Sequence, residues 1–154
     1  MSADRGLIRT TFASLLQQAL VGTGKPAQAV YDHQVGDFGG QSPVVFVASA
    51  PIRRPPLTAR GGRATVRLDV WVLVLYADPA SGWTEADAED RLDAIERAIA
   101  EVVRANQVNA IARWQAIDYA EATAPDFIEI GGPTYRRERI PLQFEVYASS
   151  RGVS

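Results

Sequence analysis

The sequence predicts an α/β fold of the α+β type: a mixed, largely antiparallel sheet with two helices packed on one face and a long extended β-ribbon. Two segments carry apolar residues at helical spacing, and two others alternate between apolar and polar residues over unusually long runs. The predicted order is helix, two strands, loop, strand, helix and two strands, which a mixed or antiparallel sheet accommodates. We expect one domain over residues 1–154, since 47% of the residues are hydrophobic and can bury a core.

The first helix is predicted over residues 4–20. Its apolar residues recur on one side, and Gly22, Gly24 and Pro26 follow as a stop. The apolar residues are Ile8, Phe12, Leu15, Leu16, Ala19 and Leu20.

Two strands and a loop are predicted next. Residues 29–31 fit a short strand, residues 36–43 carry turn-forming residues, and the β-branched and aromatic run 44–47 fits a central strand. Residues 50–62 contain three prolines, two glycines and three arginines, so we expect a long loop there.

Residues 63–77 predict one strand of unusual length. One of its faces is apolar throughout, whereas the other is polar in its first half and apolar in its second. We therefore expect the second half to be covered on both faces and the first half on one. The continuous apolar face comprises Ala64, Val66, Leu68, Val70, Val72, Val74 and Tyr76; the other comprises Thr65, Arg67 and Asp69, then Trp71, Leu73 and Leu75.

A second helix is predicted over residues 85–105. Thr84 followed by Asp87 approximates a capping box, and the acidic residues of the first turns suit the positive end of the helix dipole. We interpret the acidic run 85–93 as a solvated face rather than a paired-carboxylate site. The predicted buried stripe is Leu92, Ile95, Ile99, Val102 and Val103.

The last third of the chain predicts further strands. Trp114 and Ala116 suggest one strand, residues 125–132 a connection, and residues 135–147 a second long strand that alternates clearly. We expect Ile140, Leu142, Phe144 and Val146 on one face of it, and Arg137, Arg139, Gln143 and Glu145 on the other.

The length of the strand over residues 63–77 indicates self-assembly. At roughly 3.3 Å per residue it spans on the order of 50 Å, whereas a compact domain of this size is roughly 40 Å across. A ribbon that overhangs the core with open edges is expected to pair or pack with another chain. The alternative is that a bulge bends one strand and both strands stay within the domain.

Composition excludes several kinds of chemistry. The chain has no cysteine, so disulfides, zinc–thiolate sites and cysteine nucleophiles are absent. Its 16 basic and 18 acidic residues nearly balance, which excludes an overall basic field for nucleic acid. We recognise no signal peptide and no apolar run long enough to span a bilayer.

His33 is the one residue that could begin a catalytic or metal site. It is the only histidine and lies beside Asp32, with Asp37 nearby, which could start a dyad or a metal site. Because no second histidine or cysteine completes a coordination sphere, we interpret His33 as a solvated turn residue. No serine lies in a nucleophile elbow, so we do not expect an enzyme.

Two arginine clusters are candidates for contact with DNA phosphates or with acidic partner surfaces. The alternative for the loop cluster is a solvated exposed loop. The clusters are Arg53, Arg54, Arg60 and Arg63 in the predicted loop, and Arg136, Arg137 and Arg139 on the last strand.

Four segments carry a resemblance to a known family. They are residues 37–45 (DFGGQSPVV), 66–72 (VRLDVWV), 89–95 (EDRLDAI) and the run 131–140. Together they resemble the tail-terminator, or tail-completion, proteins of long-tailed, siphovirus-like bacteriophages, over roughly residues 5–148.

The resemblance implies a structural virion protein. Members of the family fold as a small α/β domain, form a hexameric ring that ends the tail tube, and meet the head's connector. Implied partners are therefore other copies of the chain, the tail-tube protein and the head-completion or connector protein, with DNA passing through the lumen. The implied location is the virion tail or neck, assembled in the host cytoplasm. Neither a cofactor nor a membrane partner is implied.

The candidate assembly interface follows from expected exposure rather than from a family motif. A closed ring needs two unlike subunit surfaces that fit each other. We choose Arg53, Arg54, Trp83, Arg137 and Arg139, and we expect glutamate at both 137 and 139 to impair assembly while leaving the monomer folded. Alternatives are another neck, connector or tail-tube protein, and a small hydrolase that uses His33.

Overall fold

The computed structural model describes residues 5–36, 38–39, 41–50, 63–76, 82, 84–120, 124–130 and 132–147. Its elements confirm the predicted α+β class: two helices and a six-stranded, mostly antiparallel sheet. Along the chain they are α1 (Arg5–Leu20), β1 (Ala29–Tyr31), β2 (Val44–Ser49), β3 (Arg63–Leu75), α2 (Glu85–Ala105), β4 (Trp114–Tyr119), β5 (Asp126–Glu129) and β6 (Thr134–Tyr147).

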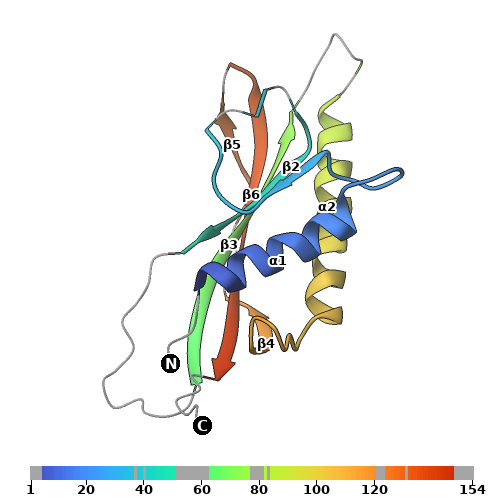
Figure 1. Ribbon diagram of the computed structural model, residues 1–154. Coiled ribbons are helices and arrows are strands. Elements are labelled where there is room, and N and C mark those ends of the chain that lie inside the picture. Colours follow the sequence, from blue (N-terminus) through green and yellow to red (C-terminus); the bar gives the residue numbers. More distant parts are fainter. Residues whose placement is uncertain are drawn as a thin grey trace.

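The sheet is built around one long ladder. Its strand order is β1-β2-β3-β6-β4, and β5 also pairs with β6; β1 and β2 are parallel, and every other pair is antiparallel. The β3–β6 pairing runs without a break from Arg63↔Tyr147 to Leu75↔Tyr135. The alternative in which a bulge bends this ribbon is therefore wrong, and its lower end extends past α1 (Figure 1).

The open edges of the sheet are short, contrary to our expectation. β3 lies between β2 and β6 from Arg67 to Leu73, whereas its first four residues, Arg63–Val66, pair with β6 alone among the described strands. β6 is flanked by β3 on one side and by β4 and β5 on the other. The outermost strands β1, β4 and β5 have three, six and four residues. The long strands thus form the middle of the sheet, except at Arg63–Val66, where β3 is itself an edge.

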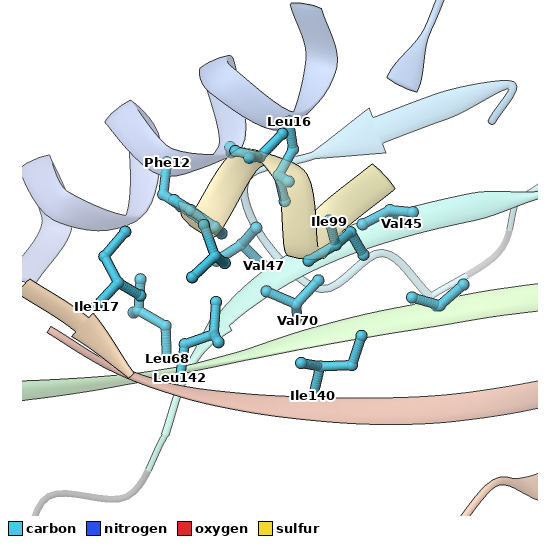
Figure 2. Close-up of a cluster of buried hydrophobic side chains, with 14 of the residues drawn as sticks. Phe12, Leu16, Val45, Val47, Leu68, Val70, Ile99, Ile117, Ile140 and Leu142 are labelled. Atoms are coloured by element: carbon cyan, nitrogen blue, oxygen red, sulfur yellow. The ribbon is translucent and has the colours of Figure 1, made fainter. Parts of the chain in front are cut away.

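Both helices cover the same face of the sheet, as predicted (Figures 1 and 2). Phe12 of α1 lies at the centre of this core and meets the rings of Trp114 and Phe144 edge-on, at centroid distances of 6.2 and 5.2 Å. α1 contacts β1 and β2, and α2 contacts β3. The sheet side of this core includes Val45, Val47, Val66, Leu68, Val70, Val72, Ile140, Leu142, Phe144 and Val146.

A smaller core lies on the opposite face, over the second half of β3. Leu73 is buried there against Phe38 and Phe46, and the Tyr135 hydroxyl donates to the Gln41 carbonyl at 3.3 Å. The prediction that this half of β3 is covered on both faces is therefore confirmed.

The N-terminus of α2 has the predicted cap. The Asp87 amide donates to Thr84 Oγ1 at 3.2 Å, and the Thr84 amide donates to Asp87 Oδ2 at 2.8 Å. These bonds lower the pKa of Asp87. Both bounds of α2 match the predicted range.

One strand prediction needs correction. We expected residues 125–132 to be a connection, but Asp126–Glu129 form β5, which is followed by a bond from Ile130 N–H to Pro133 O at 3.1 Å on the way to β6. The central strand predicted at residues 44–47 is confirmed, since β2 is buried there and lies between β1 and β3. Most of the predicted loop, residues 51–62, lies outside the described residues.

Phe12→Ala tests the role of the helix-covered core. We expect it to lower the free energy of unfolding by about 3–5 kcal/mol, because a fully buried ring is removed from between two other rings. Urea denaturation measures the loss. Leu7→Ala, on an exposed position of the same helix, is the control and should change the value by less than about 1 kcal/mol.

Candidate assembly surface

The predicted interface residues divide into two groups. Arg53, Arg54 and Trp83 lie outside the described residues, so their placement stays a prediction. Arg137 and Arg139 lie on β6 and point to the face away from the helices, as the alternation predicted.

Arg137 is bound within its own chain. Its Nε and Nη2 donate to the two carboxylate oxygens of Asp126 at 2.9 and 2.7 Å, and this guanidinium lowers the pKa of Asp126. The same guanidinium lies 4.8 Å from the ring centroid of Trp71, which stacks on Phe46. The Arg137 side chain therefore ties β5 to the outer face of the sheet.

Arg139 compensates a buried charge. Its Nη1 lies 3.5 Å from Asp69 Oδ2, and Asp69 is only 6% exposed. The other oxygen, Asp69 Oδ1, is buried without a hydrogen-bond partner. Glutamate at both 137 and 139 would place like charges beside Asp126 and Asp69, so our expectation that such a chain folds normally is corrected.

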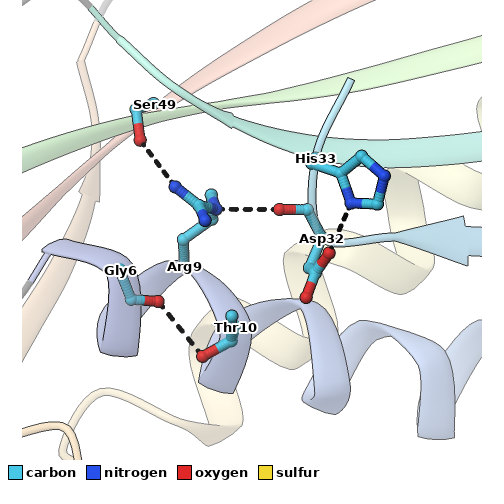
Figure 3. Close-up of polar contacts among 6 residues, drawn as sticks. All are labelled: Gly6, Arg9, Thr10, Asp32, His33 and Ser49. Atoms are coloured by element: carbon cyan, nitrogen blue, oxygen red, sulfur yellow. Dashed lines mark hydrogen bonds and ion pairs between the residues drawn. The ribbon is translucent and has the colours of Figure 1, made fainter. Parts of the chain in front are cut away.

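His33 lies in an exposed turn. Its Nδ1 is 2.7 Å from Asp32 Oδ1, and its side chain is 65% exposed (Figure 3). Asp37, the third group considered, is outside the described residues. Within the described part of the chain, no group of three or more histidine, aspartate or glutamate residues could hold a metal ion.

The far edge of the sheet, beyond β6, is blocked at β4 and open at β5. The Gln107 side chain donates to the Ile117 carbonyl at 3.0 Å and accepts from the Ile117 amide at 3.3 Å, as a neighbouring strand would. No described residue bonds the outer side of β5 in this way. Phe127 of β5 is 51% exposed, although Arg136 lies over one side of its ring.

Carboxylates gather beside this edge, between α2 and β6. Glu138 of β6 lies on the helix-covered face, where Glu96 and Asp93 of α2 face it. Burial, followed by these two like charges, raises the pKa of Glu138 to about 7. Arg136 opposes the shift, but Glu89 already binds its guanidinium at 2.7 Å.

The opposite edge of the sheet, at β1, has a groove beside it. α1 and β1 enclose about 300 Å³ of open space. Arg9 fixes the spacing, since its Nε donates to the Asp32 carbonyl at 2.8 Å and its Nη1 to Ser49 Oγ at 3.2 Å (Figure 3). The helix side of the groove is formed by Thr10, Ala13, Ser14 and Gln17.

Sequence reasoning missed Glu138, Phe127 and Gln107. Glu138 had a signal, because continuing the apolar face of Ile140 back by two residues places an acid on the buried side of β6. Phe127 was missed because its segment, β5, was predicted to be a connection rather than a strand. Gln107 had no signal, since its role depends on where β4 folds back.

Comparisons with known proteins add no identification. No family model matches the chain, and no similar protein was found among the curated proteins. Neither helix of the described part is long and apolar enough to span a membrane.

Glu138→Gln tests the carboxylate cluster. The pKa of Glu138 rises from an ordinary 4.5 to about 7 on folding, so the folded chain holds a proton that the unfolded chain has lost. The contribution of Glu138 to the stability of the wild-type chain is complete below pH 4.5 and is lost as the pH rises through 7. We expect the variant to match wild type near pH 5 and to melt higher near pH 8. Asp90→Asn, at an exposed position of α2, should show no such pH-dependent gain.

A pair of alanine variants tests the two arginines. Arg139→Ala leaves Asp69 buried and unpaired, so we expect a loss of about 3 kcal/mol, whereas Arg137→Ala returns the exposed Asp126 to water and should cost about 1 kcal/mol. Chemical denaturation measures both. Adding Asp69→Asn to Arg139→Ala should recover part of the loss; equal losses for the two single variants would contradict the assignment.

Proposed function

We propose that this chain is a structural virion protein that assembles into a ring, ends the tail tube of a long-tailed bacteriophage and joins it to the head connector. The sequence resemblance supports the tail assignment. One structural observation supports the ring: in the described part of the chain, the two outer sides of the sheet, at β1 and at β4 with β5, differ in shape and in their charged groups.

Unlike edges favour a ring over a two-fold dimer. A dimer joins the same patch on both copies, whereas a head-to-tail contact joins two different patches and closes when its rotation allows. The β3–β6 ladder holds these edges apart across the sheet. A subunit of this kind adds neighbours laterally while its two ends stay available for a tube and a connector.

The hydrolase alternative lacks support among the described residues. His33 and Asp32 are both well exposed, at 65% and 44%, and the groove beside β1 is lined by Asp32 but not by His33. His33→Ala is accordingly expected to leave assembly unchanged.

The experiment is to measure solution mass by light scattering over a concentration series and to image the larger species by electron microscopy. We expect a closed ring of about six subunits that, added to polymerising tail-tube protein, stops tube growth. Open stacks of indefinite length would instead indicate a tube subunit. A closed ring that leaves tube growth unchanged would point to another neck protein.

A further inference from the structure

We propose that neighbouring copies meet edge to edge: the β5 edge and the acidic side of α2 in one copy dock against β1 and the α1–β1 groove of the next. The inference rests on the proposed ring and names the surfaces that form it. The occupant of the groove is thus a second copy of this chain.

The β5 edge offers outward backbone groups and the half-exposed ring of Phe127, which contacts the Tyr76 ring edge-on at a centroid distance of 4.7 Å. The Ile130 amide donates to the Pro133 carbonyl, and backbone groups alternate in direction along an antiparallel pair. The N–H and C=O of Ile128 therefore point toward β6, and those of Phe127 and Glu129 point outward. No hydrogen bond from a described residue reaches the outward amides and carbonyls of these two residues. Phe127 is opposite Arg136, so its ring lies on the helix-covered face.

The β1 edge offers a matching site on the same face. β1 pairs only with β2 among the described strands, and alternation turns the amide and carbonyl of Val30 away from β2. The Val30 side chain packs toward the helices and forms one wall of the groove. Thr10, Ser14 and Gln17 line the facing wall and are exposed, so an incoming strand can reach them.

The two edges also differ in their balance of charged groups. The far edge presents Asp93, Glu96 and Glu138, and the nearby Arg136 is already bound by Glu89. The β1 edge presents Arg5 and Arg9, which lie one turn apart on α1, and also Asp32, which lines the groove and pairs with His33. Since α1 covers β1 and β2 while α2 lies toward β6, joining the edges brings these acids beside these arginines.

The blocked β4 edge directs the contact to β5. Gln107 occupies the outward backbone groups of Ile117, so a neighbour cannot extend the sheet there without displacing it. β5 carries no such cap among the described residues. Because the docking surfaces are different and lie on opposite sides, each copy binds one neighbour on each side, which is what a closed ring requires.

Disulfide trapping tests the contact directly. The chain has no cysteine, so Ser14→Cys and Glu129→Cys introduce the only thiols. We expect a mixture of the two single variants to give a cross-linked heterodimer under mild oxidation, and the double variant to give a ladder ending at the ring size. Val108→Cys, at an exposed turn between α2 and β4, replaces Glu129→Cys in the control mixture, which should give no more than background.

Charge variants test the same contact in solution. Ser14→Glu adds a second acid to the groove that Asp32 already lines and should weaken ring formation at least tenfold, whereas Gln18→Glu, exposed on α1 but outside this groove, should have little effect. Melting curves should confirm that both variants fold.

The outcomes separate this inference from the proposed function. The wild-type chain could form rings while the variants show no cross-link between cysteines at positions 14 and 129 and no response to Ser14→Glu. That result would overturn the edge contact but would not contradict the proposed ring. A wild-type chain that forms no ring, alone or on tube ends, and gives no cross-link would overturn both.

The pH dependence of assembly gives an independent check. Glu138 is faced by Glu96 and Asp93 from α2, and by Arg136 from β6. An arginine from a neighbour favours the charged form of Glu138, so assembly releases protons. The association constant should therefore rise from pH 6 to pH 8, around the pKa of about 7, and fall with added salt. A flat profile would contradict the contact.

Discussion

The unbroken pairing of β3 with β6 is the constraint on which the rest of the structure depends. It joins residues roughly 70 positions apart in the chain and fixes which side chains face the helices, because a shift of one residue would exchange the two faces. Every other strand is positioned against this ladder, directly or through β2. The helices then cover one face, and the segment containing Phe38 and Gln41 covers half of the other.

The same ladder explains why the sheet has unlike edges. β1 pairs parallel to β2 and borders the groove beside α1, while β5 is the short strand of a hairpin with β6. Like-charged Glu138 and Glu96 meet where α2 crosses β6, so the fold carries an electrostatic cost at that edge. A neighbour that supplies arginine would relieve this repulsion.

Local pattern was enough to predict the helices, the two long strands and their faces, because each is set by periodicity and by caps such as Thr84 with Asp87. It was not enough for β5, whose four residues are stabilised as a strand by β6 and by the Asp126–Arg137 pair. Nor could it show that Arg137 and Arg139 are bound within the chain, or that Glu138 faces Glu96, since these depend on register and helix placement.

Amide hydrogen exchange, compared between dilute and assembled protein, tests the central claim most directly. We expect the β3–β6 amides to exchange slowest in both states, and the amides of Val30, Phe127 and Glu129 to exchange readily in dilute protein and to become protected on assembly. Protection that appears elsewhere, with these three amides unchanged, would contradict the edge-to-edge account.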